Sequence, residues 1–314
     1  MKPDMKKALK WVGVTILALY AVIVIAGPIA LINIVCDKHV SYSRVFAAEE
    51  FGLPEPDTLY LNTTDGFCIH TLKIAPEDSA RGVVICISGI ENPSVTAFYG
   101  HVKEFRKSGL VSYLPDVRGH GESDGDRICL AYEETEDINA VVRQAVSDYP
   151  DVPVILMGLS MGGGIAIRAG VNENVDAIVT LSAFSSFQDV VGGMLGHYIT
   201  PVLAAPAKLS SALYAGIKFG VNPFRETPLE DAPRLAGKPV LMMHSRADTQ
   251  VPYKCFVKLL RSITKSSCPE GASPVHTYVI EGDRHFIADK FLYPAGDTAY
   301  FSALSGFIGN LCVN

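Results

Sequence analysis

The chain has 314 residues, 48% of them hydrophobic, and a formal net charge of −6. An acidic chain without a basic stripe argues against a nucleic-acid-binding protein, and the length fits one α/β domain behind an N-terminal segment. The seven cysteines are an odd number without metal-ligand spacing. We therefore expect no disulfide framework, no metal and no cofactor.

The N-terminus contains an apolar run, from Trp11 to Val35, that has no charged side chain. As a helix, this run is long enough to cross the ~30 Å hydrocarbon core of a bilayer. Four lysines precede it, and Lys38 and Arg44 follow. This bias predicts a cytoplasmic tail and one transmembrane helix within residues 1–35, with the rest of the chain on the outer side. A cleaved secretion signal is the alternative, although its apolar core is usually only about 7–15 residues long.

Beyond the apolar run, residues 36–56 are predicted to form a linker, with a short helix at 41–51. Residues 57–314 are predicted to form one domain. It begins with two alternating segments, 57–63 and 67–74, that are expected to be strands. Short apolar runs then alternate with helical segments, which is typical of the α/β class: a mostly parallel sheet with helices on both faces. The expected strands are 83–87, 111–114, 154–157, 177–181, 239–243 and 275–280, and the main helices are 97–107, 133–149, 252–264 and 298–310.

The alternation stops between residues 187 and 230. This segment is rich in Gly, Pro, Ala and Leu, has helical pieces and contains no expected strand. An insertion of this kind, after a central strand, predicts a small helical lid over the edge where the strands end. A helical excursion with a purely structural role is the alternative.

A G-x-S-x-G sequence, Gly158 to Gly162, lies between an apolar run and a helical segment. A strand that turns at once into a helix places the central Ser160 on a sharp bend, and the glycines remove side chains that would collide there. The bend also directs the backbone N–H of Met161 toward an oxyanion that forms at Ser160. The pattern therefore predicts a nucleophilic serine.

A serine hydroxyl needs a base to take its proton and an acid to orient that base. In a parallel sheet these partners belong in the turns after later strands, because the carboxyl ends of the strands meet at one edge. Asp248 is the one carboxylate in the turn after 239–243, and His285 is the one histidine in the turn after 275–280. The chain therefore predicts a Ser160–His285–Asp248 triad.

Other polar residues fit these roles less well. Asp116 follows a strand that precedes the serine, so it is expected to shape the turn after it. His120, between two glycines, is expected to bond to backbone groups, and His244 ends a strand, where a packed role is equally consistent.

From about residue 50 to the C-terminus the chain resembles the α/β-hydrolase superfamily, and within it the serine aminopeptidase-type and monoacylglycerol-lipase-type hydrolases. The matching stretches are Gly-Leu-Pro at 52–54, Thr-Asp-Gly at 64–66, DVRGHGESDG at 116–125, GLSMGGG at 158–164, HSRADTQVP at 244–252 and GDRHF at 282–286. The family often has His-Gly after its third strand, where this chain has Ser88-Gly89-Ile90. The resemblance implies that the backbone N–H of Ile90 is the second oxyanion donor, beside that of Met161.

The resemblance and the apolar insertion together predict a membrane-tethered serine hydrolase that cleaves small-molecule esters of acyl chains through an acyl-enzyme. Two alternatives remain open. One is an amidase or peptidase that uses the same triad, and the other is a catalytically silent binding module with the hydrolase fold. No nucleic-acid partner is expected, and the sequence does not indicate an oligomeric state.

Overall fold

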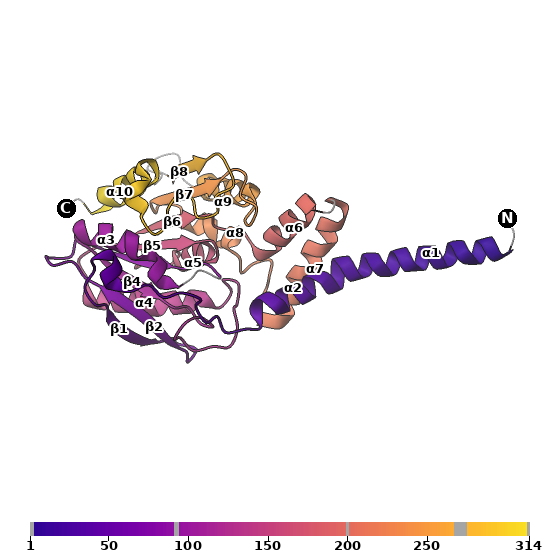
Figure 1. Ribbon diagram of the computed structural model, residues 1–314, viewed down its shortest axis with the longest axis horizontal. Coiled ribbons are helices and arrows are strands. Elements are labelled where there is room, and N and C mark those ends of the chain that lie inside the picture. The colour runs from indigo at the N-terminus through magenta and orange to yellow at the C-terminus, as the bar shows by residue number, and fades with distance from the viewer. Residues whose placement is uncertain (1–2, 91–93, 199–200, 267–274, 313–314) are drawn as a thin grey trace.

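The computed structural model describes residues 3–90, 94–198, 201–266 and 275–312 (Figure 1). Its centre is an eight-stranded sheet with the order β1-β2-β4-β3-β5-β6-β7-β8. β1 and β2 pair antiparallel at one edge, and the strands from β4 to β8 run parallel. The strands are β1 Asp57–Asn62, β2 Cys68–Ile74, β3 Gly82–Ile87, β4 Leu110–Pro115, β5 Val154–Leu159, β6 Ala177–Leu181, β7 Val240–Ser245 and β8 Val275–Ile280. The predicted α/β architecture is confirmed.

The central strands β3 and β5 carry no polar side chain because both faces of the sheet are covered. Along β3, Val83, Ile85 and Ile87 enter one core, and Val84 and Cys86 enter the other. This alternation is the two-residue period of a strand.

The helices divide between these two cores. Helices α3 (Tyr99–Lys107) and α10 (Thr298–Leu311) contribute to the core on one face. The opposite face is covered by α4 (Glu134–Asp148), α5 (Met161–Ala169) and α9 (Tyr253–Ser266). Helices therefore cover both faces, as the sequence predicts.

The helix expected at 41–51 is reduced to a 3-10 turn, Ala48–Phe51. The residues before this turn bond to distant parts of the chain instead of to one another. The N–H of Val40 donates to the carbonyl of Gly119 (2.7 Å), and the N–H of Phe46 donates to Oγ1 of Thr96 (2.8 Å). The bond at Phe46 uses an N–H group that a helix over 41–51 would have needed.

The 187–230 insertion is helical, with α6 (Phe187–Tyr198), α7 (Pro201–Phe219) and α8 (Pro228–Asp231), and its described residues contain no strand. Helices α6 and α7 pack against each other and project from the body (Figure 1). Asp189, buried at the base of α6, forms ion pairs with Lys208 of α7 and Lys258 of α9. Burial raises the pKa of Asp189, but the two ammonium groups outweigh it and lower the pKa to about 2. The insertion is therefore fixed at its base.

The N-terminal apolar run forms one long helix. It consists of α1 (Pro3–Ala21), a π-helical turn (Val22–Ala26) and α2 (Gly27–Cys36). The segment Met5–Cys36 is the one helix of the described residues that is long and apolar enough to cross a membrane, and most of its apolar stretch is exposed. Figure 1 shows α1 projecting away from the body, whereas α2 packs beside α7.

Candidate active site

The predicted sharp turn is present at Ser160, between β5 and α5. Ser160 has φ +55° and ψ −114°, a conformation that L-residues rarely adopt. A Cβ at Gly158 would lie 2.0 Å from the carbonyl oxygen of Gly162, and a Cβ at Gly162 would lie 2.2 Å from that of Ile87. Only glycine fits at both positions, so the motif's spacing is dictated by this turn.

The predicted oxyanion donors are the backbone N–H groups of Met161 and Ile90. Met161 is the first residue of α5, and the N–H groups of a first helical turn have no partner within the helix. Ile90 follows β3 and lines the same cavity as Ser160. The carbonyl of Ile90 lies 3.0 Å from Nε2 of His120, which is 2% exposed.

Asp248 lies in the turn after β7, and both of its carboxylate oxygens are engaged. Oδ1 accepts hydrogen bonds from the N–H groups of Gln250 (2.8 Å) and Val251 (2.9 Å), and Oδ2 lies 2.8 Å from Nδ1 of His285. Burial alone would raise the pKa of this carboxyl group. Its bond to His285 and the two N–H groups outweigh that effect and lower the pKa below its ordinary value. Asp248 is thus held as a carboxylate.

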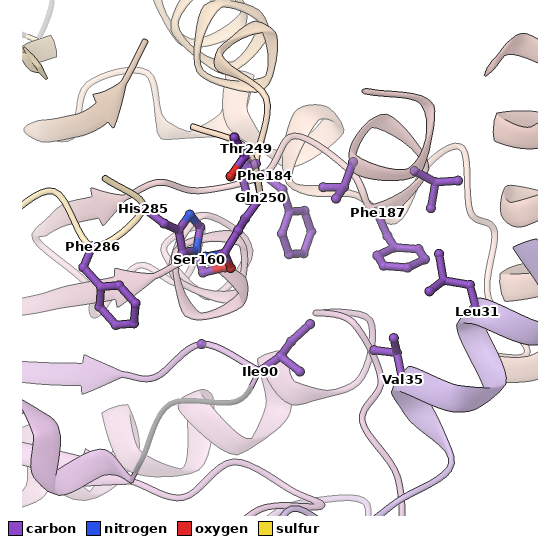
Figure 2. Close-up of a pocket in the computed structure, with 14 residues that line it drawn as sticks. Leu31, Val35, Ile90, Ser160, Phe184, Phe187, Thr249, Gln250, His285 and Phe286 are labelled. Carbon is purple, nitrogen blue, oxygen red and sulfur yellow. The ribbon is translucent and has the colours of Figure 1, made fainter. Parts of the chain in front are cut away.

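His285 lies in the turn after β8 and is 7% exposed. Because a carboxylate can only accept, Nδ1 of His285 donates to Asp248, which leaves Nε2 available as a base. The hydroxyl of Ser182 donates to the backbone carbonyl of His285 (2.7 Å). His285 and Ser160 line one cavity, and Figure 2 shows the imidazole directed toward Ser160. The structure therefore brings together the three residues that the sequence singles out.

The turns that carry Asp248 and His285 are joined directly. The hydroxyl of Ser245 donates to the carbonyl of Gly282 (2.6 Å), and the N–H of Ala247 donates to the same oxygen (2.8 Å). The N–H of Arg246 donates to the carbonyl of Ile280 (3.0 Å). These bonds hold the carboxylate and the imidazole in a fixed relative position.

The less favoured polar residues have other partners. Asp116 accepts a hydrogen bond from the hydroxyl of Tyr42 (2.6 Å) and lies 2.8 Å from Nδ1 of His70. His120 lies between the carbonyls of Arg118 and Ile90, and His244 lies 3.0 Å from the carbonyl of Val251. Each therefore supports a turn.

The described residues contain no group of three or more His, Cys, Asp or Glu side chains suited to a metal ion.

The cavity above Ser160 has a volume of about 690 Å³, within the usual range for small-molecule sites. Its walls are mostly apolar (Figure 2). The described lining residues are Leu31, Val35, Gly89, Ile90, Ser160, Phe184, Phe187, Val190, Val191, Thr249, Gln250, Val251, His285 and Phe286. Two of them, Leu31 and Val35, come from the N-terminal helix, which the sequence predicts to be an anchor separate from the domain.

Comparison with known proteins agrees with this architecture. A family model described as "Serine aminopeptidase, S33" matches residues 78–266. The chain is 33% identical over 233 residues to the monoacylglycerol lipase of Mycolicibacterium smegmatis. The aligned region covers 70% of this chain and 75% of that protein. An uncharacterised protein of Bacillus subtilis is 24% identical over 319 residues, which is 98% of both chains. An esterase of Pyrococcus furiosus, 21% identical, has the same fold with a TM-score of 0.65 over 88% of this chain and 99% of that one.

Proposed function

Because the chain belongs to the serine aminopeptidase S33 family of α/β-hydrolases, we propose that it is a serine hydrolase that cleaves carboxyl esters of acyl chains. The observation that carries the proposal is the position of Ser160, His285 and Asp248 at one cavity, with the 2.8 Å contact between the last two. The protein is esterase- and lipase-like, and the triad chemistry is our inference.

In the proposed reaction, Nε2 of His285 takes the proton from the hydroxyl of Ser160 as Oγ attacks the acyl carbonyl. The carbonyl oxygen becomes an oxyanion and accepts hydrogen bonds from the N–H groups of Met161 and Ile90. The ester bond then breaks, and His285 gives its proton to the departing alcohol. Water, deprotonated by His285, attacks the acyl-enzyme, and the acid leaves as Ser160 regains its proton. Asp248 stabilises the imidazolium in both halves of the reaction.

The cavity favours esters over peptides. An aminopeptidase has to bind a charged substrate amine, and a carboxylate is the natural partner for that group. The described residues that line the cavity include no Asp or Glu, and most are apolar. The monoacylglycerol lipase relative supports an ester substrate, whereas the family description keeps an amidase or peptidase activity as the second candidate.

We also propose that the N-terminal helix anchors the enzyme in a membrane, with the N-terminus in the cytoplasm and the catalytic domain outside. The lysines before the apolar run support this orientation. A cleaved secretion signal fits less well, because Leu31 and Val35 form part of the cavity wall and cleavage after the run would remove them. Alkaline extraction should leave the full-length chain in the membrane pellet; a soluble, shortened chain would favour cleavage.

The decisive test of the activity is labelling with a fluorophosphonate probe. The purified full-length protein in detergent should be labelled, and Ser160→Ala should abolish labelling, whereas the exposed control Ser302→Ala should not. Matched ester and anilide substrates then separate an esterase from an amidase. A folded wild-type protein that binds acyl compounds but neither reacts with the probe nor turns over a substrate would be the silent binding module.

A further inference from the structure

One end of the cavity is built by the N-terminal helix, which we propose above as the membrane anchor. Leu31 and Val35, one turn apart on α2, face the cavity together with Phe184 and Phe187. Figure 2 shows Ser160 and His285 at one side of this space and Leu31 and Val35 at the other. Between them the cavity is lined mainly by apolar side chains, among them Phe184 and Phe187, and the polar Thr249 and Gln250 lie near Ser160.

The chemistry of ester cleavage assigns this end of the cavity to one part of the substrate. The departing oxygen has to face the imidazole, because His285 protonates it. The acyl chain therefore extends away from His285, toward Leu31 and Val35. We infer that Leu31 and Val35 of the N-terminal helix close the acyl-chain site and set the chain length that the enzyme accepts. This inference rests on the proposed esterase function.

The wall at Leu31 and Val35 is held in place from two sides. Toward the core, Ile32 and Cys36 of α2 are fully buried, and the carbonyl of Cys36 accepts the N–H of Ile128 (2.9 Å). Buried core packing of this kind leaves little room for α2 to shift.

Toward the insertion, three residues of α7 bond to the N-terminal helix, one on each successive turn. The hydroxyl of Ser210 donates to the carbonyl of Val24. The hydroxyl of Tyr214 donates to Oδ1 of Asn33 (2.7 Å), and Nζ of Lys218 donates to the same oxygen (3.0 Å). Lys218 also pairs with Asp37. The N-terminal helix and α7 therefore form one unit, so the cavity's far wall cannot move without the insertion.

Tryptophan substitution tests this assignment in the full-length protein in detergent. Leu31→Trp and Val35→Trp should fill the far end of the cavity. On 4-nitrophenyl esters, kcat/KM should fall by about tenfold or more for chains of twelve carbons and longer, because overfilled apolar sites discriminate at that level. The acetate is the internal reference, because so short a chain does not reach α2, and kcat/KM should therefore fall at least about tenfold more for the long-chain esters than for the acetate. Ile34→Trp is the matched control, because Ile34 is on the same helix and 73% exposed. Its kcat/KM should depend on chain length as that of the wild type does.

Each outcome decides one of the two claims. One outcome is a wild type that hydrolyses esters while Leu31→Trp and Val35→Trp lower kcat/KM equally for all chain lengths, or for none. That result would overturn the acyl-site assignment and leave the esterase function intact. A folded wild type that hydrolyses no ester would overturn the proposed function.

A second readout does not require turnover. A long-chain fatty acid with a terminal diazirine should cross-link to residues 27–36 of the Ser160→Ala variant. Adding Ile34→Trp to this variant should leave the cross-link, whereas adding Leu31→Trp should abolish it. Equal cross-linking in all three would contradict the inference. Unchanged melting temperatures would show that the variants are folded.

Discussion

Nδ1 of His285 lies 2.8 Å from Oδ2 of Asp248, although 37 residues of chain separate them. Strands β7 and β8 run parallel and paired, with His244 opposite Val279 and Ser245 opposite Ile280, so the turns that follow them leave the sheet side by side. Parallel pairing thus converts two distant turns into one hydrogen-bonded acid–imidazole pair.

Asp248→Asn should lower kcat by about 10³–10⁴-fold, because an amide that donates to Nδ1 leaves the proton on Nε2 and removes the base. The amide oxygen can still accept the N–H groups of Gln250 and Val251, so the turn should remain intact. Ester hydrolysis and the melting temperature measure the two effects. Asp283→Asn, an exposed carboxylate near His285, is the control and should stay close to wild type. A comparable loss in Asp283→Asn, or none in Asp248→Asn, would exclude Asp248 as the acid.

His120 is predicted to position the loop that carries Ile90. Its buried ring bonds to the Ile90 carbonyl (3.0 Å), so His120→Ala should displace the Ile90 N–H from the oxyanion. We expect kcat to fall by about 10-fold or more with KM nearly unchanged, because the loss of one oxyanion donor costs up to about 10²–10³-fold. Steady-state kinetics on one ester measure kcat and KM separately.

The control for His120 is His39→Ala. His39 bonds to the carbonyls of Gly125 (2.8 Å) and Gly121 (2.9 Å), which belong to the same turn as His120 but not to the Ile90 loop. Its replacement should change kcat by less than about threefold, since no oxyanion donor depends on it. Equal effects at both positions would mean that His120 acts only on the stability of the turn.

All eight strands could be predicted from the sequence, because each is an apolar or alternating run, and β3 and β5 at the centre are apolar since both faces of the sheet are covered. Ser160, Asp248 and His285 could be placed because each follows a strand. The support of Ile90 by His120 could not, because it joins two turns 30 residues apart and no pattern marks such a bond. Leu31 and Val35 could not be predicted as cavity residues either, since an apolar side chain has the same hydropathy whether it faces lipid or a cavity.

Arg118 is predicted to be the main stabilising cation of the turn after β4. Its side chain is 2% exposed, and it bonds to Asp137 (2.7 Å) and to Asp65 (2.7 Å). Arg118→Met leaves the buried Asp137 without its ion pair, which typically costs about 3–5 kcal/mol of the free energy of unfolding. Urea unfolding should show this loss. Arg143→Met, which breaks the half-exposed pair with Glu136, should cost no more than about 1 kcal/mol. Similar losses for both would contradict the special role of the buried pair.

Glu134 is predicted to make stability depend on pH. It is fully buried at the start of α4. Oε1 accepts the N–H of Cys129 (2.7 Å), and Oε2 has no hydrogen-bond partner among the described residues. Burial raises the pKa of this carboxyl group from its ordinary 4.5 to about 7. A raised pKa in the folded state means that the neutral form stabilises the protein below pH 4.5, and that this contribution is lost as the pH rises through 7.

Glu134→Gln keeps the acceptor for Cys129 and removes the ionisation. Wild type and variant should therefore have similar stability near pH 4.5, and the wild type should become less stable than the variant between pH 5 and 8. At 1.36 kcal/mol for each pKa unit, the difference should approach about 3 kcal/mol above pH 8. Urea unfolding across this pH range measures it, with the exposed Glu173→Gln as the control. If the Glu134→Gln and wild-type curves stay parallel, Glu134 does not titrate in this range and its burial carries no pH-dependent cost.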